Sequence, residues 1–268
     1  MAKLTSLLRF NGSLDGITVY RLPGVSDPVA RTTWGPSKED LQRKPQYAQT
    51  RRNLSESCGR GKATSWLMKA FQPLKPLADF DTAGQLNRLL RAVQKGDTES
   101  PWGERAVRLS RFPHLPEGFR LTKVLPFDSV VRGEVGVRMD RDTLSATVEL
   151  PELRPRLTFF PPPGFAYCRL LVTLGVAPDV IHGPQGWGTD GDYTKCFAQA
   201  AYTDWFAAAK GSGATTLQLQ LPYTPPSESF ALVLAVGMQL GEPGLTGGVE
   251  TVRGRVGSAR ILAVGGRT

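Results

Sequence analysis

Hydrophobic and polar residues alternate along much of the second half of the chain. Between 143 and 149 the apolar residues Leu144, Ala146 and Val148 occupy every second position, and leucine does the same between 216 and 221. Each of these segments therefore has one apolar and one polar face, which is the pattern of a half-buried strand. Continuous apolar runs at 166–176 and 230–238 indicate central strands covered on both faces.

Turn-forming segments rich in proline and glycine separate these strands. A last strand is expected at 258–264, and the turns lie at 161–164, 183–191, 222–227 and 241–248. Six or more short strands at this spacing, with almost no helical pattern between them, favour an antiparallel β-sandwich or barrel. A parallel α/β sheet is disfavoured because it would need crossover helices.

The first residues of the chain show shorter strand patterns. Strands are expected at 5–10, 17–22 and 29–34, with the turn Asn11-Gly12-Ser13 between the first two. Asn-Gly favours a hairpin because both residues tolerate positive φ. A hairpin or a three-stranded meander is therefore predicted at the N-terminus.

A helical region follows this hairpin. Ser37 is a suitable N-cap for a helix, and the acidic residues after it suit the first turn. Pro45 ends that helix unless it occupies the first turn of a new one. Helical composition then continues through 46–57 and 63–71, where Gly59 and Gly61 are expected to kink or separate the two segments.

The clearest helix of the chain is predicted after Asp81. Apolar residues recur there at i, i+3, i+4 and i+7, and Gly96 suits the C-cap. The apolar stripe consists of Leu86, Leu89, Leu90 and Val93, which leaves the basic residues of this helix on or beside the solvent side.

These elements predict an α+β fold. An N-terminal β-hairpin or meander with short helices is followed by an antiparallel β-sandwich. The predicted division is a basic hairpin-plus-helices region at 1–122 and a β-sandwich domain at 123–268.

Positive charge is concentrated in the first half of the chain. Residues 1–123 carry 21 Lys and Arg against 11 Asp and Glu, whereas residues 124–268 carry 12 against 13. Such a field attracts phosphates, acidic protein surfaces or anionic lipid alike. The residues expected to contact an anionic partner are Arg43, Lys44, Arg51, Arg52, Arg60 and Lys62.

Scarce residue types argue against several chemistries. The chain has two histidines and three cysteines, in no zinc-binding spacing. The segment 183–191 lacks the Gly-Lys-Ser/Thr ending of a phosphate loop and is expected to be a long surface loop. We therefore expect no enzyme activity, no catalytic residues, no cofactor and no metal. Cys168 and Cys196 are expected to be buried, and Cys58 to pack on a helix.

Three segments of the sequence resemble a family of uncharacterised bacterial proteins, a domain of unknown function. They are FNGSLDGITVYRLPG, RTTWGPSKEDLQRKPQYAQTRRNLSESCGRGKA and GSARILAV. The resemblance implies an N-terminal Gly-rich hairpin, a basic Gln/Arg-rich helix and a C-terminal half of immunoglobulin-like appearance. It implies no catalytic residue, substrate or cofactor. The matching residues are Gly12, Gly16 and Tyr20 in the hairpin, Arg31 at a strand end, and Tyr47, Arg51 and Arg52 in the helix.

Two functions remain open from the sequence. The first is a non-enzymatic structural or assembly module that self-associates or docks on a protein partner through the basic half, by exposed strand edges and a basic helical face. The second is nucleic-acid binding, since aromatic residues are interleaved with the basic residues. With no apolar run of membrane-spanning length and no evident signal peptide, we expect a cytoplasmic protein, or one exported by a route that the sequence does not show. We expect no membrane partner.

Overall fold

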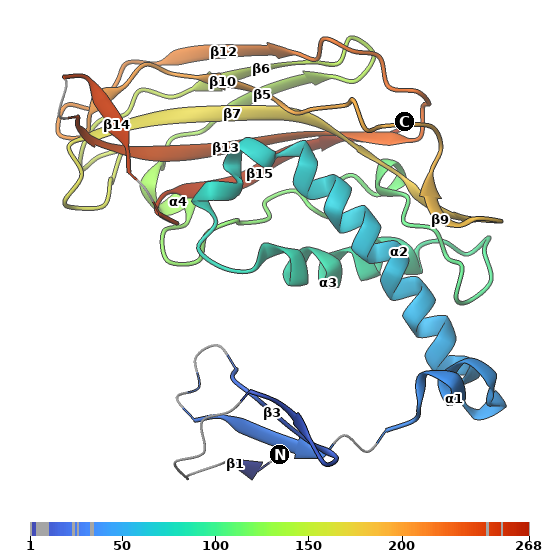
Figure 1. The fold of residues 1–268 in the computed structure, drawn as a ribbon. Helices are drawn as coiled ribbons and strands as arrows, with labels where there is room; N and C mark the ends of the chain where they lie inside the picture. Colours follow the sequence, from blue (N-terminus) through green and yellow to red (C-terminus); the bar gives the residue numbers. More distant parts are fainter. Residues whose placement is uncertain are drawn as a thin grey trace. The chain divides into compact units, whose positions relative to one another are not determined.

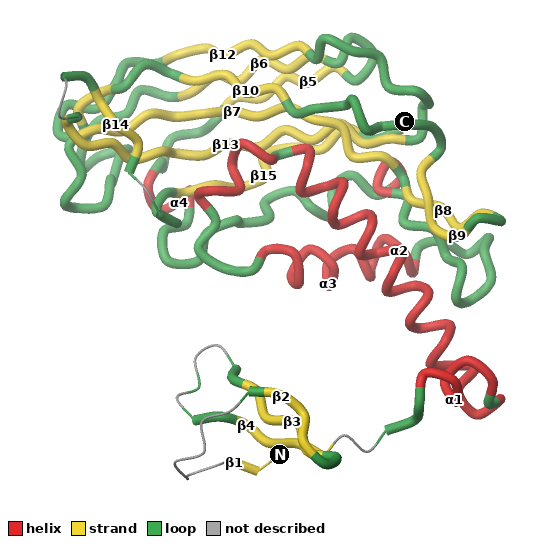
Figure 2. Tube along the Cα trace, viewed as in Figure 1, coloured by secondary structure: helices red, strands yellow, loops and turns green. Residues whose placement is uncertain are grey.

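The computed structural model describes residues 2–3, 11–22, 25, 27–32, 35–244, 247–252 and 254–267. The backbone forms two compact units, 1–52 and 53–268. Helices and antiparallel strands are both present, as Figure 2 shows, so the predicted α+β class is confirmed.

The first unit contains a small antiparallel sheet. Its strands have the order β1-β4-β3-β2, with β1 at Ala2–Lys3, β2 at Gly12–Leu14, β3 at Ile17–Tyr20 and β4 at Val29–Thr32. The predicted hairpin is present, but the turn expected at Asn11-Gly12 is wrong. Asp15 and Gly16 form the turn instead, with φ of 47° and 79°, the left-handed backbone that a two-residue hairpin turn needs. The strand expected at 5–10 lies outside the described residues.

Two short helices follow this sheet. In α1 (Lys38–Arg43), the Ser37 hydroxyl accepts a hydrogen bond from the Asp40 amide, as the capping pattern predicts. Pro45 is the first residue of the 3₁₀ helix η1 (Pro45–Tyr47), where its missing N–H is tolerated. The alternative in which Pro45 begins a new helical turn is therefore confirmed.

The long helix α2 (Ala48–Ala70) runs without interruption through both glycines. The expected kink or separation at Gly59 and Gly61 is wrong. Gly59 is buried against the ring of Trp187, where an added Cβ would lie 2.6 Å from a ring carbon. This glycine therefore provides space for a distant side chain and does not break the helix.

The helices η2 (Gln72–Leu77) and α3 (Thr82–Lys95) follow α2. Asp81 caps α3 by accepting a hydrogen bond from the Ala83 amide, and Gly96 is its C-cap. Leu86, Leu90 and Val93 are buried, so the predicted helix and its apolar stripe are confirmed.

Two antiparallel sheets follow, drawn together in Figure 1. In the larger one the order is β10-β7-β13-β14, with β11 paired to β7 and β15 paired to β13; the smaller one has the order β12-β6-β5, and β8 and β9 form a separate hairpin. The bounds are β5 (Gly136–Asp140), β6 (Ser145–Leu150), β7 (Tyr167–Pro178), β8 (Val180–Gly183), β9 (Gly186–Thr189), β10 (Gln199–Tyr202), β11 (Phe206–Ala207), β12 (Thr215–Gln220), β13 (Phe230–Pro243), β14 (Val249–Thr251) and β15 (Ser258–Gly265), with short helices η3 (Leu109–Arg111) and α4 (Phe127–Val130).

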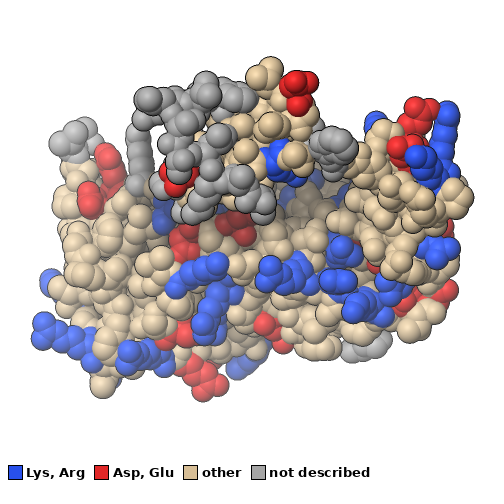
Figure 3. Space-filling view, turned by 90° about the horizontal axis from the view of Figure 1, so that it is seen from below, with Lys and Arg blue, Asp and Glu red and all other residues tan. Residues whose placement is uncertain are grey.

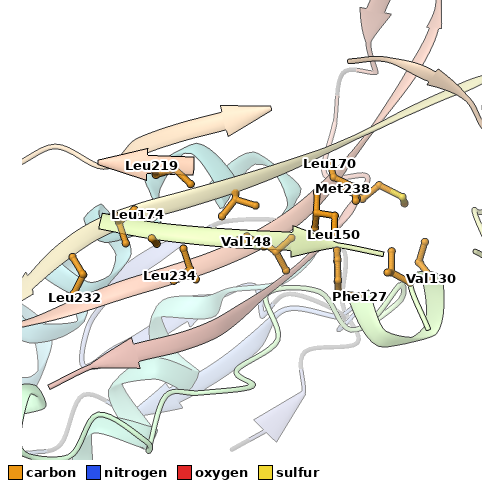
Figure 4. Packing of buried hydrophobic residues seen from close by; sticks show 14 of the residues in the cluster. Phe127, Val130, Val148, Leu150, Leu170, Leu174, Leu219, Leu232, Leu234 and Met238 are labelled. Atoms are coloured by element: carbon orange, nitrogen blue, oxygen red, sulfur yellow. The ribbon is translucent and has the colours of Figure 1, made fainter. Parts of the chain in front are cut away.

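The two sheets of the second unit share one hydrophobic core. Leu174 of β7 and Leu234 of β13 face Val148 of β6 and Leu219 of β12 across it (Figure 4). The predicted antiparallel, two-sheet arrangement is thus present as a curled β-structure, and the strands predicted by alternation lie at its inner face. The segment 183–191, expected to be a loop, is in part the hairpin of β8 and β9.

A second core lies on the other face of the larger sheet. There Leu171 of β7 and Val233 of β13 pack with Leu67 of α2 and Leu90 of α3. Successive residues of β7 and β13 thus enter different cores, which explains why these strands are apolar throughout. Because α2 and α3 share this core with the sheet, the division between units falls at 52/53, whereas the sequence predicted a boundary at 122/123.

No helix among the described residues is both long enough and apolar enough to cross a bilayer.

Candidate interaction surface

The basic residues around α1 are held by acidic and carbonyl oxygens of the same unit. Arg43 pairs with Glu39 at 2.9 Å and Lys44 with Asp40 at 3.0 Å, both with a spacing of four residues. These pairs are exposed, so they add little to stability. The hydrogen bond from Lys44 also lowers the pKa of the Asp40 carboxyl.

Arg51 connects α2 to the end of α1. Its Nη1 donates to the carbonyl oxygens of Leu41 and Lys44, each at 2.9 Å. Carbonyls at a helix C-terminus lack partners within the helix, and a guanidinium satisfies them well. Arg51 therefore has a structural role in the turn between these helices. Arg52 is exposed and also takes part in an interaction within the protein.

Further along α2, two of the predicted contact residues are bonded to other elements. Arg60 donates to Asn87 at 3.3 Å and to Gln94 at 2.5 Å, both on α3. Burial lowers the pKa of Arg60, and the nearby charge of Arg91 acts in the same direction. Lys62 donates to the carbonyl oxygen of Trp187 at 2.5 Å. That these six residues contact an anionic partner stays a prediction.

A buried carboxylate anchors the middle of α2. Glu56 accepts two hydrogen bonds from Arg105, at 2.6 and 2.8 Å, and one from the Gly103 amide at 3.1 Å. Burial acts to raise the pKa of Glu56, but these donors outweigh it and hold the pKa below its usual value. The pair joins α2 to the segment after α3.

The sequence analysis did not assign a contact role to the basic residues of α3. Arg88, Arg91 and Lys95 are exposed at i, i+3 and i+7 and have no acidic partner among the described residues. Figure 3 shows several Lys and Arg side chains, with some Asp and Glu among them, on the face of the molecule seen from below. The sequence could have indicated these residues, because the solvent side of the helix predicted at 82–95 carries basic residues and no acidic ones.

A hollow of about 410 Å³ lies between α2, η2 and the start of α3. Its lining includes Lys69 and Lys75, which the sequence analysis did not include among the contact residues. Both are exposed. The hollow is formed by Gly61, Thr64, Ser65, Met68, Lys69, Gln72, Lys75 and Ala83.

The exposed surface of the first unit is partly apolar. Leu14 at the end of β2 and Ile17 at the start of β3 are 67% and 47% exposed, and they lie directly opposite one another in the sheet. The signal for this pair in the sequence was one apolar residue on each side of the turn Asp15-Gly16.

The three cysteines differ in exposure. Cys168 is buried, as expected, and Cys196 is partly buried, whereas Cys58 is exposed on α2 and does not pack inside. The described residues contain no group of three or more His, Cys, Asp or Glu that could hold a metal ion.

No family model, curated protein or solved structure matches this chain. The resemblance to an uncharacterised bacterial family therefore stays a prediction.

Proposed function

We propose that this chain is a non-enzymatic assembly module of the cytoplasm, which associates with a second copy of itself or docks on a protein partner through its basic N-terminal half. The observation that carries the proposal is the edge strand β2. All three of its residues are exposed, and among the described residues β2 pairs only with β3. An exposed strand edge is a template for pairing with another chain.

The geometry of the turn indicates which backbone groups are free. A two-residue turn at Asp15-Gly16 makes Leu14 and Ile17 the first hydrogen-bonded pair of the ladder. The next pair, Ser13 and Thr18, is then a non-hydrogen-bonded pair, in which the backbone N–H and C=O groups of each residue point away from the opposite strand. The N–H and C=O of Ser13 thus face the open edge, and only its hydroxyl bonds to Thr18, at 2.7 Å.

Apolar side chains beside this edge support the same proposal. Strand addition at β2 would bring a new chain next to Leu14, whose side chain is largely in water. Burying such residues is favourable by roughly 25 cal/mol per Å² of apolar surface. A partner strand would therefore gain both backbone hydrogen bonds and apolar contact.

The test is the molar mass measured by light scattering after size exclusion. We expect the wild-type chain to exceed its monomer mass of 29.1 kDa. Ser13→Pro removes the outward N–H without removing a bond to β3, and should shift the mass toward the monomer. The matched control, Ser13→Ala, loses the same hydroxyl but keeps the N–H and should leave the mass unchanged. A wild-type monomer at all concentrations contradicts self-association and leaves only docking on a different protein. An unchanged mass for Ser13→Pro in an oligomeric wild type contradicts the role of the β2 edge.

Nucleic-acid binding is the second candidate, supported by the acid-free basic side of α3. If it holds, absorbance at 260 nm should accompany the protein peak at low salt and disappear at high salt. Arg88→Glu with Arg91→Glu should then weaken binding to all sequences alike. Absence of 260 nm absorbance and of oligonucleotide binding at low salt would exclude this candidate.

A further inference from the structure

The hollow between α2, η2 and α3 combines positive charge with hydroxyl groups. Its lining contains two lysines and no carboxylate. Among the described residues Lys75 has no acidic partner, and the ammonium of Lys69 lies 4.0 Å from the centroid of the Trp66 ring. A ring contact of this kind orients an ammonium but does not neutralise it. Two positive charges are thus available to one ligand.

Polar groups of α2 complete the same wall. Ser65 is exposed in the hollow. Thr64 is 4% exposed, and its Oγ1 has no hydrogen-bond partner among the described residues. A buried hydroxyl without a partner is unfavourable, and buried polar groups in folded proteins are nearly always bonded. The Thr64 oxygen is covered by protein atoms, so the hydroxyl that a ligand in the hollow can reach is that of Ser65.

The start of α3 borders the hollow through Ala83. Its amide already donates to Asp81, at 3.2 Å, so the helix terminus offers no free donor at this residue. Asp81, whose carboxylate caps this helix, is not one of the residues that line the hollow. The groups of the hollow that can contact an anion are therefore Lys69, Lys75 and the Ser65 hydroxyl.

The size of the hollow indicates what kind of anion fits. A volume of about 410 Å³ lies in the range of small-molecule pockets and exceeds that of a phosphate alone. Met68 and Ala83 add apolar surface beside the lysines. We propose that this hollow binds the phosphate group of a phosphorylated ligand, with Lys69 and Lys75 as the charged contacts and the hydroxyl of Ser65 beside them.

Two other hollows of the second unit give weaker support for a ligand site. In the one lined by Arg120 and Lys123, Arg120 is already paired with Asp128 at 3.6 Å, and Lys123 lies over the ring of Phe80. The one lined by Pro161, Pro162 and Pro163 is mainly apolar, and nothing in the structure shows what covers it.

Inorganic pyrophosphate is the probe for the test, by isothermal titration calorimetry on the full-length chain. We expect saturable binding to the wild type at a stoichiometry of one. The double variant Lys69→Gln, Lys75→Gln should weaken the affinity at least tenfold. Its matched control, Arg88→Gln with Lys95→Gln, removes the same charge from the exposed side of α3 and should change the affinity less than twofold. Thermal unfolding of each variant checks that it is folded.

The outcomes separate a built site from general charge attraction. Equal losses in both double variants, or no saturable binding to the wild type, would overturn the proposal. A single-stranded oligonucleotide then distinguishes two sources of the phosphate. Displacement of pyrophosphate by the oligonucleotide assigns the hollow to a polymer backbone, whereas simultaneous binding assigns it to a free small molecule. Neither result depends on the oligomeric state, so this site and the assembly surface are tested independently.

Discussion

Gly175 in the middle of β7 lies directly against the backbone of Ala70, the last residue of α2. A Cβ at position 175 would overlap the carbonyl oxygen of Ala70. Because backbone atoms on both sides form this contact, no side-chain rotation can relieve the overlap. The glycine thus sets how closely the end of α2 approaches the larger sheet.

Gly175→Ala should therefore destabilise the protein by about 2 to 3 kcal/mol, because overpacking forces helix and sheet apart. Gly188→Ala is the matched control, since nothing lies within 4 Å of a Cβ at that position, and its effect should stay within about 0.5 kcal/mol. The free energies of unfolding in urea provide the comparison. Equal stability of the two variants would show that the contact is not rigid.

Glu56 makes the stability depend on pH in the acidic range. The pKa of its carboxyl is lowered in the folded state, so the stabilisation is fully present above the unfolded value of about 4.3 and is lost as the pH falls through the folded pKa. Glu56→Gln should flatten this part of the curve. It should also cost about 3 kcal/mol at neutral pH, because Arg105 then loses its charged partner. Unfolding free energies measured between pH 3 and 7 test both expectations, and an unchanged acid limb for the variant contradicts them.

The three thiols should differ in reactivity. Cys58 is exposed and should be modified by a thiol reagent in the folded protein, whereas burial raises the pKa of Cys168 to about 12 and keeps it protonated. Peptide mass spectrometry after brief labelling at pH 8 identifies the modified positions. Cys58→Ser should remove the fast phase, and rapid labelling of Cys168 without denaturant would show that the shared core of the two sheets opens.

Two buried threonines provide a test of the unpartnered hydroxyl. Thr64→Val removes a group without a hydrogen bond and should raise the stability of the unliganded protein by about 1 kcal/mol. Thr122→Val should lower it by about 1 to 2 kcal/mol, because the Thr122 hydroxyl donates to Leu125 at 2.7 Å. Thermal and urea unfolding measure both changes. A loss of stability in Thr64→Val would show that its hydroxyl has a partner, such as an ordered water.

Local patterns in the sequence were sufficient for most elements of the fold. The alternation around Val148 identified β6, and the cap at Asp81 identified the start of α3, because both signals involve neighbours in the chain. Gly59 was misjudged because its role depends on Trp187, which lies far along the sequence. A glycine that makes room for a ring and a glycine that breaks a helix are alike in sequence.

The contacts of the basic residues likewise depend on residues far away in the sequence. The density of Lys and Arg along the sequence does not indicate which of them bond to other parts of the protein. Lys62 donates to a carbonyl 125 residues away, and Arg60 donates to two residues of α3. Whether a basic residue lies on the exposed side of α3 or in the hollow depends on how α2, η2 and α3 pack together, which the local sequence does not show.

The register of β7 against β13 continues from Phe230 opposite Pro178 to Gly241 opposite Tyr167, with a hydrophobic core on each side. Solvent can reach these amides only when both layers separate, so their hydrogen exchange should follow global unfolding. The amides of β2, at an exposed edge, should exchange through local fluctuations. The exchange rates of the β7–β13 amides thus provide a slow internal reference for deuterium uptake. If exchange slows at β2 and stays unchanged at β7 and β13, a partner has bound at the β2 edge.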